Sequence, residues 1–154
     1  MKILVLGYGN EFRQDDRVGH ELAPRLVAWL QERGHEADLW LGQQVLPEIV
    51  YDLAEVELAL FVDASVEILD EGWRLESLEA DRKLEGLNIH AVGPAWVLAL
   101  MEDLGLNRPR AYLLSVSGHS FDFSEKLSPD CQVHVEAAWK GFLSWWSLIE
   151  DSQG

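Results

Sequence analysis

The most constraining feature of this sequence is the stretch Leu6–Gly19, L-G-Y-G-N-E-F-R-Q-D-D-R-V-G, which directly continues an apolar run. An apolar strand that ends in a tight glycine turn is typical of the first strand and loop of an α/β domain, where ligand-binding groups gather at the carboxyl end of the strand. Two adjacent acids, Asp15 and Asp16, then precede a helical pattern. We therefore expect both acids at the mouth of a cleft.

A dinucleotide-binding loop is the obvious alternative for this stretch, and it fits poorly. The fingerprint requires a third glycine, but Phe12 stands at that position. It also requires an acid at the end of the second strand, where this chain has Gly42 and two glutamines. We therefore expect no nucleotide cofactor.

Length and charge restrict the classes of partner. The 154 residues suffice for one domain, 1–154, with a single sizeable core. The chain has 27 acidic and 12 basic residues and a net charge of −15, so we expect no nucleic-acid partner and no anionic membrane. Cations or a basic partner segment suit this charge better, although much of it can simply keep the surface soluble.

Cysteine content and hydropathy indicate a cytoplasmic protein. Cys131 is the only cysteine, which rules out an intrachain disulfide and suits a reducing compartment. The start M-K-I-L-V-L-G is broken by glycine too early for a signal peptide, and no apolar run approaches the roughly 18 residues of a membrane span.

Apolar strands alternate with helical patterns along the chain, without repeats or linkers. This alternation predicts a three-layer α/β/α sandwich around a mostly parallel, twisted sheet of about five strands. The predicted helices are Arg17–Arg33, Pro47–Ala54, Ala95–Leu104 and a long helix that follows the N-cap Ser128. The predicted strands are 3–6, Glu36–Leu41, Glu57–Ala64, an edge strand Trp73–Ala80, a short strand ending near Ile89 and His90, and Ala111–Val116.

Single residues and apolar spacing predict where the first helix bends and ends and which side of the last helix is buried. Pro24 should kink the first helix and Gly34 should end it. Apolar residues recur at helical spacing in the last helix, so we expect most of its tryptophans in a core or an interface. Its predicted buried side consists of Val135, Ala138, Trp139, Phe142, Leu143, Trp146 and Ile149.

Asp63 ends the most apolar strand of the chain. Its position predicts a carboxylate in the crevice where open α/β sheets bind ligands. A helix-capping or loop aspartate is the alternative interpretation.

Among the five histidines, His90 is the best candidate for catalysis or metal binding, because it follows a strand-like segment and precedes a helix. A surface or structural histidine remains the alternative. His119, in the loop S-G-H-S-F-D-F, is a second candidate, whereas His20, His35 and His134 have only helical or turn contexts.

These residues belong to a distributed pattern that resembles the hydrogenase maturation endopeptidases, the family that trims the C-terminal tail of the large subunit of nickel-iron hydrogenases. The pattern comprises the first block, Q-Q-V-L-P-E-I after the second strand, F-V-D-A, His90 with A-V-G-P, and L-S-P before the last helix. It spans roughly residues 3 to 145, and the first block is its most specific part.

The resemblance implies that Asp16, Asp63 and His90 contact a metal ion, with Asp16 and Asp63 also catalytic. Asp16 is the shorter acid where some members carry glutamate, and Arg17 stands where many members have glycine. The expected supporting residues are Gly7, Gly9, Asn10 and Asp15, of which Asp15 would orient the loop or cap the following helix.

Two carboxylates and one imidazole suit a borderline ion such as nickel and leave coordination positions open. The resemblance further implies that nickel arrives on the substrate, a loaded large-subunit precursor, and that the protein is a nickel-dependent hydrolase. We expect the protein itself to be monomeric. The alternative is a non-catalytic maturation chaperone that binds the same metalloprotein without cutting it.

Overall fold

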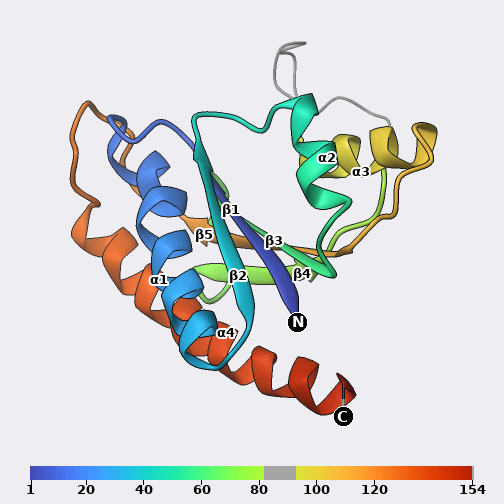
Figure 1. Cartoon of the computed structure of the whole chain (residues 1–154). Helices are drawn as coiled ribbons and strands as arrows, with labels where there is room; N and C mark the ends of the chain where they lie inside the picture. The colour runs from blue at the N-terminus through green and yellow to red at the C-terminus, as the bar shows by residue number, and fades with distance from the viewer. Residues whose placement is uncertain (82–92, 154) are drawn as a thin grey trace.

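The computed structural model describes residues 1–81 and 93–153, the side chain of Gln153 excepted. Its centre is a twisted five-stranded sheet with the strand order β2-β1-β3-β5-β4 (Figure 1). Four strands run parallel, and their carboxyl ends therefore meet at one edge of the sheet. These strands are β1 (Lys2–Tyr8), β2 (Glu36–Gly42), β3 (Leu58–Ser65) and β5 (Arg110–Ser117).

Helices cover both faces of this sheet (Figure 1). On one face lie α1 (Val18–Glu32) and α4 (Pro129–Gln153), and on the other lie α2 (Val50–Leu53) and α3 (Pro94–Asp103). Ile3 and Val5 of β1 enter the core beneath α1 and α4, whereas Leu4 and Leu6 enter the core on the opposite face. Burial on both faces is the reason why the central strands are continuously apolar. The predicted α/β class, the three layers and the mostly parallel sheet are confirmed.

The predicted edge strand is present but shorter than expected. β4 (Trp73–Ser77) pairs antiparallel with β5 and ends before the predicted boundary at Ala80. The other predicted short strand, ending near Ile89 and His90, lies outside the described residues.

Two predicted helices begin with a 3₁₀ turn. The first is η1 (Gln14–Arg17), which leads into α1. Pro24 lies inside α1. The second is η2 (Pro47–Ile49), which leads into α2 and takes up much of the predicted helix Pro47–Ala54. The helix predicted at Arg17–Arg33 is therefore confirmed as α1, whereas the helix predicted at Pro47–Ala54 is correct in position and less regular than the sequence pattern indicates.

The predicted helix ends are confirmed in their hydrogen bonds. Gly34 follows α1 with φ +89°, and the His35 N–H donates to the Leu30 carbonyl at 3.2 Å, as in a Schellman motif. At the start of α4, the Ser128 hydroxyl accepts the Cys131 N–H at 3.2 Å and caps the first turn.

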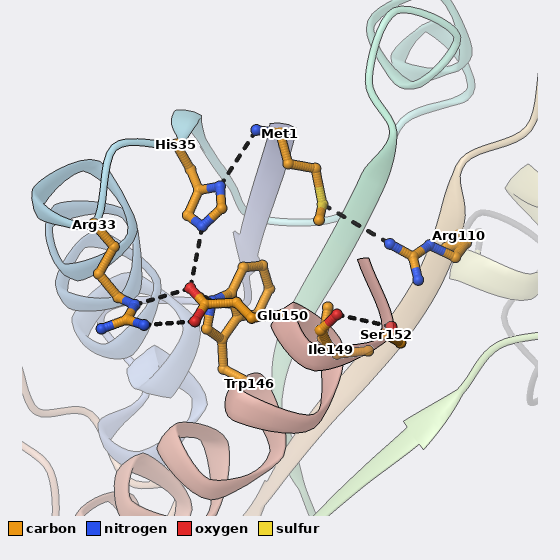
Figure 2. A network of polar contacts seen from close by, with 8 residues as sticks. All are labelled: Met1, Arg33, His35, Arg110, Trp146, Ile149, Glu150 and Ser152. Carbon is orange, nitrogen blue, oxygen red and sulfur yellow. Dashed lines mark hydrogen bonds and ion pairs between the residues drawn. The ribbon is translucent and has the colours of Figure 1, made fainter. Parts of the chain in front are cut away.

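The C-terminal helix is held by an aromatic core and by a polar network. Phe142 and Trp146 are buried, and Trp29 of α1 meets Phe142 edge to face at 5.7 Å. Near the end of α4, Glu150 bonds to Arg33 and His35 of the turn after α1 (Figure 2). Among the helices of the described residues, none combines the length and apolarity that crossing a bilayer requires.

Candidate active site

The structure delivers Asp16 and Asp63 to the same edge of the sheet. Asp63 lies near the carboxyl end of β3, the middle strand, and Asp16 lies in η1, which packs against β3. The first turn of α1 also approaches that strand end, since a Cβ on Gly19 would stand 2.7 Å from the Val62 carbonyl oxygen. Two acids that are far apart in the chain therefore share one ligand-binding edge.

Glycines make this close approach possible. A Cβ on Gly7 would lie 2.2 Å from the carbonyl oxygen of Gly19, so β1 and the start of α1 touch backbone to backbone. Gly9 has φ +136°, and a Cβ there would lie 2.1 Å from the Asp16 carbonyl oxygen and 3.2 Å from its Oδ1. Only glycine combines this backbone conformation with the space that Asp16 occupies.

Asp16 is half-buried and keeps one carboxylate oxygen open. Its Oδ2 accepts the Asn10 N–H at 2.7 Å, whereas its Oδ1 accepts no hydrogen bond from the residues that the structure describes. Burial raises the pKa of Asp16 above its ordinary value, against the opposing influence of the Asn10 hydrogen bond, His20 and Arg13. Asn10 in turn accepts the Phe12 N–H at 3.0 Å through its side chain, which shapes the loop after β1.

Asp15 is fully buried and bonds to a distant loop. Its carboxylate accepts the backbone N–H groups of His119, Ser120 and Ser128 at 2.7–2.8 Å and the Ser128 hydroxyl at 2.7 Å. Burial acts to raise the pKa of Asp15, but the hydrogen bonds from Ser128, Ser120 and His119 outweigh it and hold the pKa below its ordinary value. These bonds go to residues 118–128 rather than to the first turn of α1, where a capping role would place them.

Backbone pairing strengthens the same junction. The Gln14 N–H donates to the Ser124 carbonyl at 2.9 Å, and the Ser124 N–H donates to the Phe12 carbonyl at 3.0 Å. The Arg13 guanidinium lies over the Phe123 ring at 4.7 Å. The loop that carries Asp16 is thus held on one side by the loop after β5.

His20 is a site residue that sequence reasoning missed. Its Nε2 lies 2.8 Å from the Gly9 carbonyl oxygen and 3.1 Å from that of Gly42, and because both partners only accept, Nε2 carries the proton. His20 therefore ties the loop after β1 to the end of β2. The available signal was its spacing of one helical turn from Asp16.

A pocket of about 370 Å³ opens beside the Asp16 loop. It is lined by the loop after β1, the end of β2 and His20, with Phe12 and Leu41 as apolar walls and Glu11 as an acidic wall. The lining residues Gly9 and Asn10 belong to the loop that leads to Asp16.

Of the two remaining predicted metal ligands, Asp63 lies within the described residues and His90 does not. Asp63 is half-buried and stands opposite Ser115 of β5, whereas His90 lies outside the described residues. Within 1–81 and 93–153, no group of three or more His, Cys, Asp and Glu side chains is arranged to hold a metal ion. The His119 ring is exposed and lies 3.4 Å from the Asp130 carboxylate.

The site thus offers carboxylates of contrasting character. Asp15 accepts hydrogen bonds at both carboxylate oxygens and holds two loops together, whereas Asp16 retains an oxygen that accepts no hydrogen bond from the described residues. Carboxylates placed in this way can bind a cation or accept a proton from water.

Comparison with known proteins identifies the fold. No protein-family model matches the sequence, and no curated protein matches it with significance. Solved structures do match over nearly the full chain. The hydrogenase-maturating endopeptidase HybD from E. coli superposes with a TM-score of 0.71 at 23% identity, covering 98% of this chain and 94% of that one.

Two archaeal structures agree. The hydrogenase 2 maturation peptidase from a Thaumarchaeota archaeon has a TM-score of 0.63 at 23% identity and covers 96% of this chain and 99% of its own. The NiFe hydrogenase maturation protease HycI from Thermococcus kodakarensis has a TM-score of 0.63 at 22% identity, with coverages of 89% and 87%. The chain therefore has the fold that these maturation proteases share.

Proposed function

We propose that this protein is a hydrogenase maturation endopeptidase, which removes the C-terminal extension of a nickel-loaded hydrogenase large-subunit precursor. The observation that carries the proposal is the match of almost the whole chain to structures named as hydrogenase maturation endopeptidases or proteases, with Asp16 and Asp63 at the edge where sheets of this kind bind ligands. A fold alone does not define a reaction, so the site residues bear the chemical argument.

Nickel enters this scheme as part of the substrate. The precursor carries the ion, and the side chains proposed to coordinate it are those of Asp16, Asp63 and His90. The open Oδ1 of Asp16 is suited to this role, because its Oδ2 is already oriented by the Asn10 N–H. Two carboxylates and one imidazole leave positions on the ion for a water or for the scissile carbonyl.

Cleavage then requires an activated water and a stabilised oxyanion. We assign water activation to the nickel ion or to one of the two carboxylates, and oxyanion stabilisation to the ion. Because an unloaded precursor brings no nickel, it cannot complete the site. The reaction would act as a check that the metal has been inserted, and we propose that it takes place in the cytoplasm.

The test is mass spectrometry of precursor incubated with the purified protein, with and without nickel. The wild type should shorten only the loaded precursor. Asp16→Asn and Asp63→Asn should each slow cleavage by roughly 100-fold or more, as loss of a catalytic carboxylate does. Asp38→Asn, at an exposed acid of β2, is the matched control and should cleave normally.

Thermal melts separate lost chemistry from lost folding. Since burial raises the pKa of Asp16, its ionised form is disfavoured in the folded state, and this penalty grows as pH rises through the folded pKa. Asp16→Asn should therefore melt at or above the wild-type temperature at pH 7. Normal cleavage by this variant would remove Asp16 from the mechanism. Binding of loaded precursor by the wild type without any cleavage would instead establish a maturation chaperone.

A further inference from the structure

We propose that the loop between β3 and β4, residues 66–72, is the element that docks the folded precursor, with Ile68 and Val66 as its contact residues. This inference rests on the proposed function and deepens it, because it names the surface that chooses the substrate. The loop begins three residues after Asp63, so a partner seated on it lies next to the edge of the sheet that carries Asp63.

Its apolar side chains are unusually exposed. Ile68 is 98% exposed, the highest value for any large apolar side chain in the described part of the chain, and Val66 is 83% exposed. A single exposed apolar residue is common and needs no explanation. Two within three positions, in the loop that follows a proposed catalytic acid, indicate a contact surface.

The loop is also held rigidly around Ile68. The Ser117 hydroxyl accepts the Leu69 N–H at 2.9 Å and donates to the Glu67 carbonyl at 3.0 Å, so it fastens the residues on both sides of Ile68. Ser117 and Leu69 are themselves buried. Ile68 is thereby projected outward from an ordered backbone rather than from a loose one.

Further bonds complete this support. The Gly118 N–H donates to the Ser65 carbonyl at 2.8 Å, and the Ser117 N–H donates to the Gly72 carbonyl at 2.8 Å. Both ends of the loop are thus joined to the end of β5. A pre-ordered apolar contact loses little conformational entropy on binding, which is a property of strong interface residues.

Charge defines the partner surface. Three acids, Glu67, Asp70 and Glu71, line a hollow of about 440 Å³ together with Ile68 and Trp73. Arg74, the basic residue of this hollow, is shared between Glu67 at 3.8 Å and Glu76 at 3.3 Å, so the hollow stays negative. The complementary surface of the precursor is an apolar patch that contacts Ile68 and is bordered by lysine or arginine side chains facing the acids.

The experiment measures binding of the nickel-loaded precursor by calorimetry and its cleavage by steady-state kinetics. Ile68→Asp should raise both the dissociation constant and KM about tenfold or more, because the contact residue becomes charged. Its kcat should stay within about twofold, because the bound substrate still meets an intact site. Leu148→Asp on α4 is the matched control, since Leu148 is also exposed, at 67%.

Two further variants test whether the Ser117 hydrogen bonds and the acidic side chains of the loop contribute to binding. Ser117→Ala should weaken binding of the precursor in the wild-type background. It should have no further effect in the Ile68→Asp background, because the two hydrogen bonds of the Ser117 hydroxyl act on binding only by positioning Ile68. The double variant Asp70→Asn with Glu71→Gln should weaken binding and reduce its dependence on salt concentration.

The outcomes distinguish this inference from the proposed function. If Ile68→Asp binds and cleaves like the wild type, or if Leu148→Asp is equally impaired, the docking loop is refuted while the endopeptidase activity stands. If the wild type binds but does not cleave, the activity is refuted, and loss of binding in Ile68→Asp still supports the loop. If the wild type neither binds nor cleaves, both fail.

Discussion

At the scale of the residue, the neighbouring acids Asp15 and Asp16 differ in their hydrogen bonds and have pKa shifts of opposite sign. From the described residues, Asp15 accepts four hydrogen bonds and its pKa is lowered, whereas Asp16 accepts one and its pKa is raised. Both are removed from water to some degree, so the difference comes from the number of donors that each one meets. The same residue type therefore serves as a structural anchor at one position and as a proposed metal-gripping group at the next.

Replacing Asp15 by asparagine tests the structural role. An amide can accept with one oxygen only, and its NH₂ group would face N–H and O–H donors, so we expect a loss of about 3 kcal/mol in the free energy of unfolding. For a chain of this size, that corresponds to a fall of roughly 6–12 °C in Tm. Thermal melts at pH 7 measure it.

The pH dependence gives a second check on Asp15. Because its folded pKa is lowered, its stabilisation is present above the ordinary value of 3.8 and is lost as pH falls through the folded value. The difference in stability between wild type and Asp15→Asn should therefore shrink in strong acid. An unchanged Tm at pH 7 would contradict the anchoring role.

At the scale of the element, the contact between β1 and α1 sets the geometry of the site. The two elements meet at glycines, which lets the helix start directly above the strand end. The loop that carries Asp16 connects them, so its position depends on how closely they pack. Any added volume at this contact should move the loop as well as weaken the fold.

Gly7→Ala tests this dependence. Its Cβ would stand 2.2 Å from a backbone oxygen, and we expect a loss of about 2–3 kcal/mol from overpacking together with impaired precursor cleavage. Gly34→Ala at the other end of α1 is the control: it has φ +89° and no neighbouring atom within 4 Å. That variant should lose about 1–2 kcal/mol through its left-handed backbone and keep its cleavage rate.

At the scale of the whole molecule, the end of α4 is joined to the turn between α1 and β2. Glu150 accepts from Trp146 at 2.8 Å, from Arg33 at 3.0 Å and from His35 at 3.4 Å (Figure 2). The Arg33 hydrogen bond is the largest influence that lowers the pKa of Glu150 to about 2. This network closes the layer of helices on one face of the sheet.

Glu150→Gln should weaken the fold modestly. The pair with Arg33 is partly exposed, so water screens it and its contribution to stability at pH 7 is small. Because the folded pKa is lowered from 4.5, this stabilisation is present above pH 4.5 and disappears as pH falls toward 2. Melts at pH 7 and pH 3 should show the gap closing, and a wider gap in acid would refute the assignment. Glu136→Gln, at a more exposed pair with Arg25, should have a smaller effect.

The sequence predicted the elements well because their signals are local. Apolar spacing, Gly34 and the Ser128 cap each act within a few residues, and each is found as predicted. The regular helix predicted at Pro47–Ala54 was less accurate, since a 3₁₀ turn and a single helical turn both fit a pattern that short.

The candidate site was only partly predictable. The position of Asp16 and Asp63 at one edge of the sheet was predictable because the carboxyl ends of parallel strands meet there, and their role in the site stays a prediction. The roles of His20 and of Ser117 were not, because their partners are backbone atoms from other loops. A sequence pattern shows where an acid or an imidazole stands along the chain, but not which carbonyl it will meet.

The sequence by itself determined the α/β class, the alternation of strands and helices, the place of Asp63 at a strand end and that of Asp16 just before the first helix, since these follow from short-range periodicity and backbone preference. Only the tertiary structure decided that Asp15 would bond to residues 119, 120 and 128 while Asp16 kept an open oxygen. The physical reason is that burial and hydrogen-bond partners are set by packing between distant segments, and these contacts give two adjacent aspartates opposite pKa shifts.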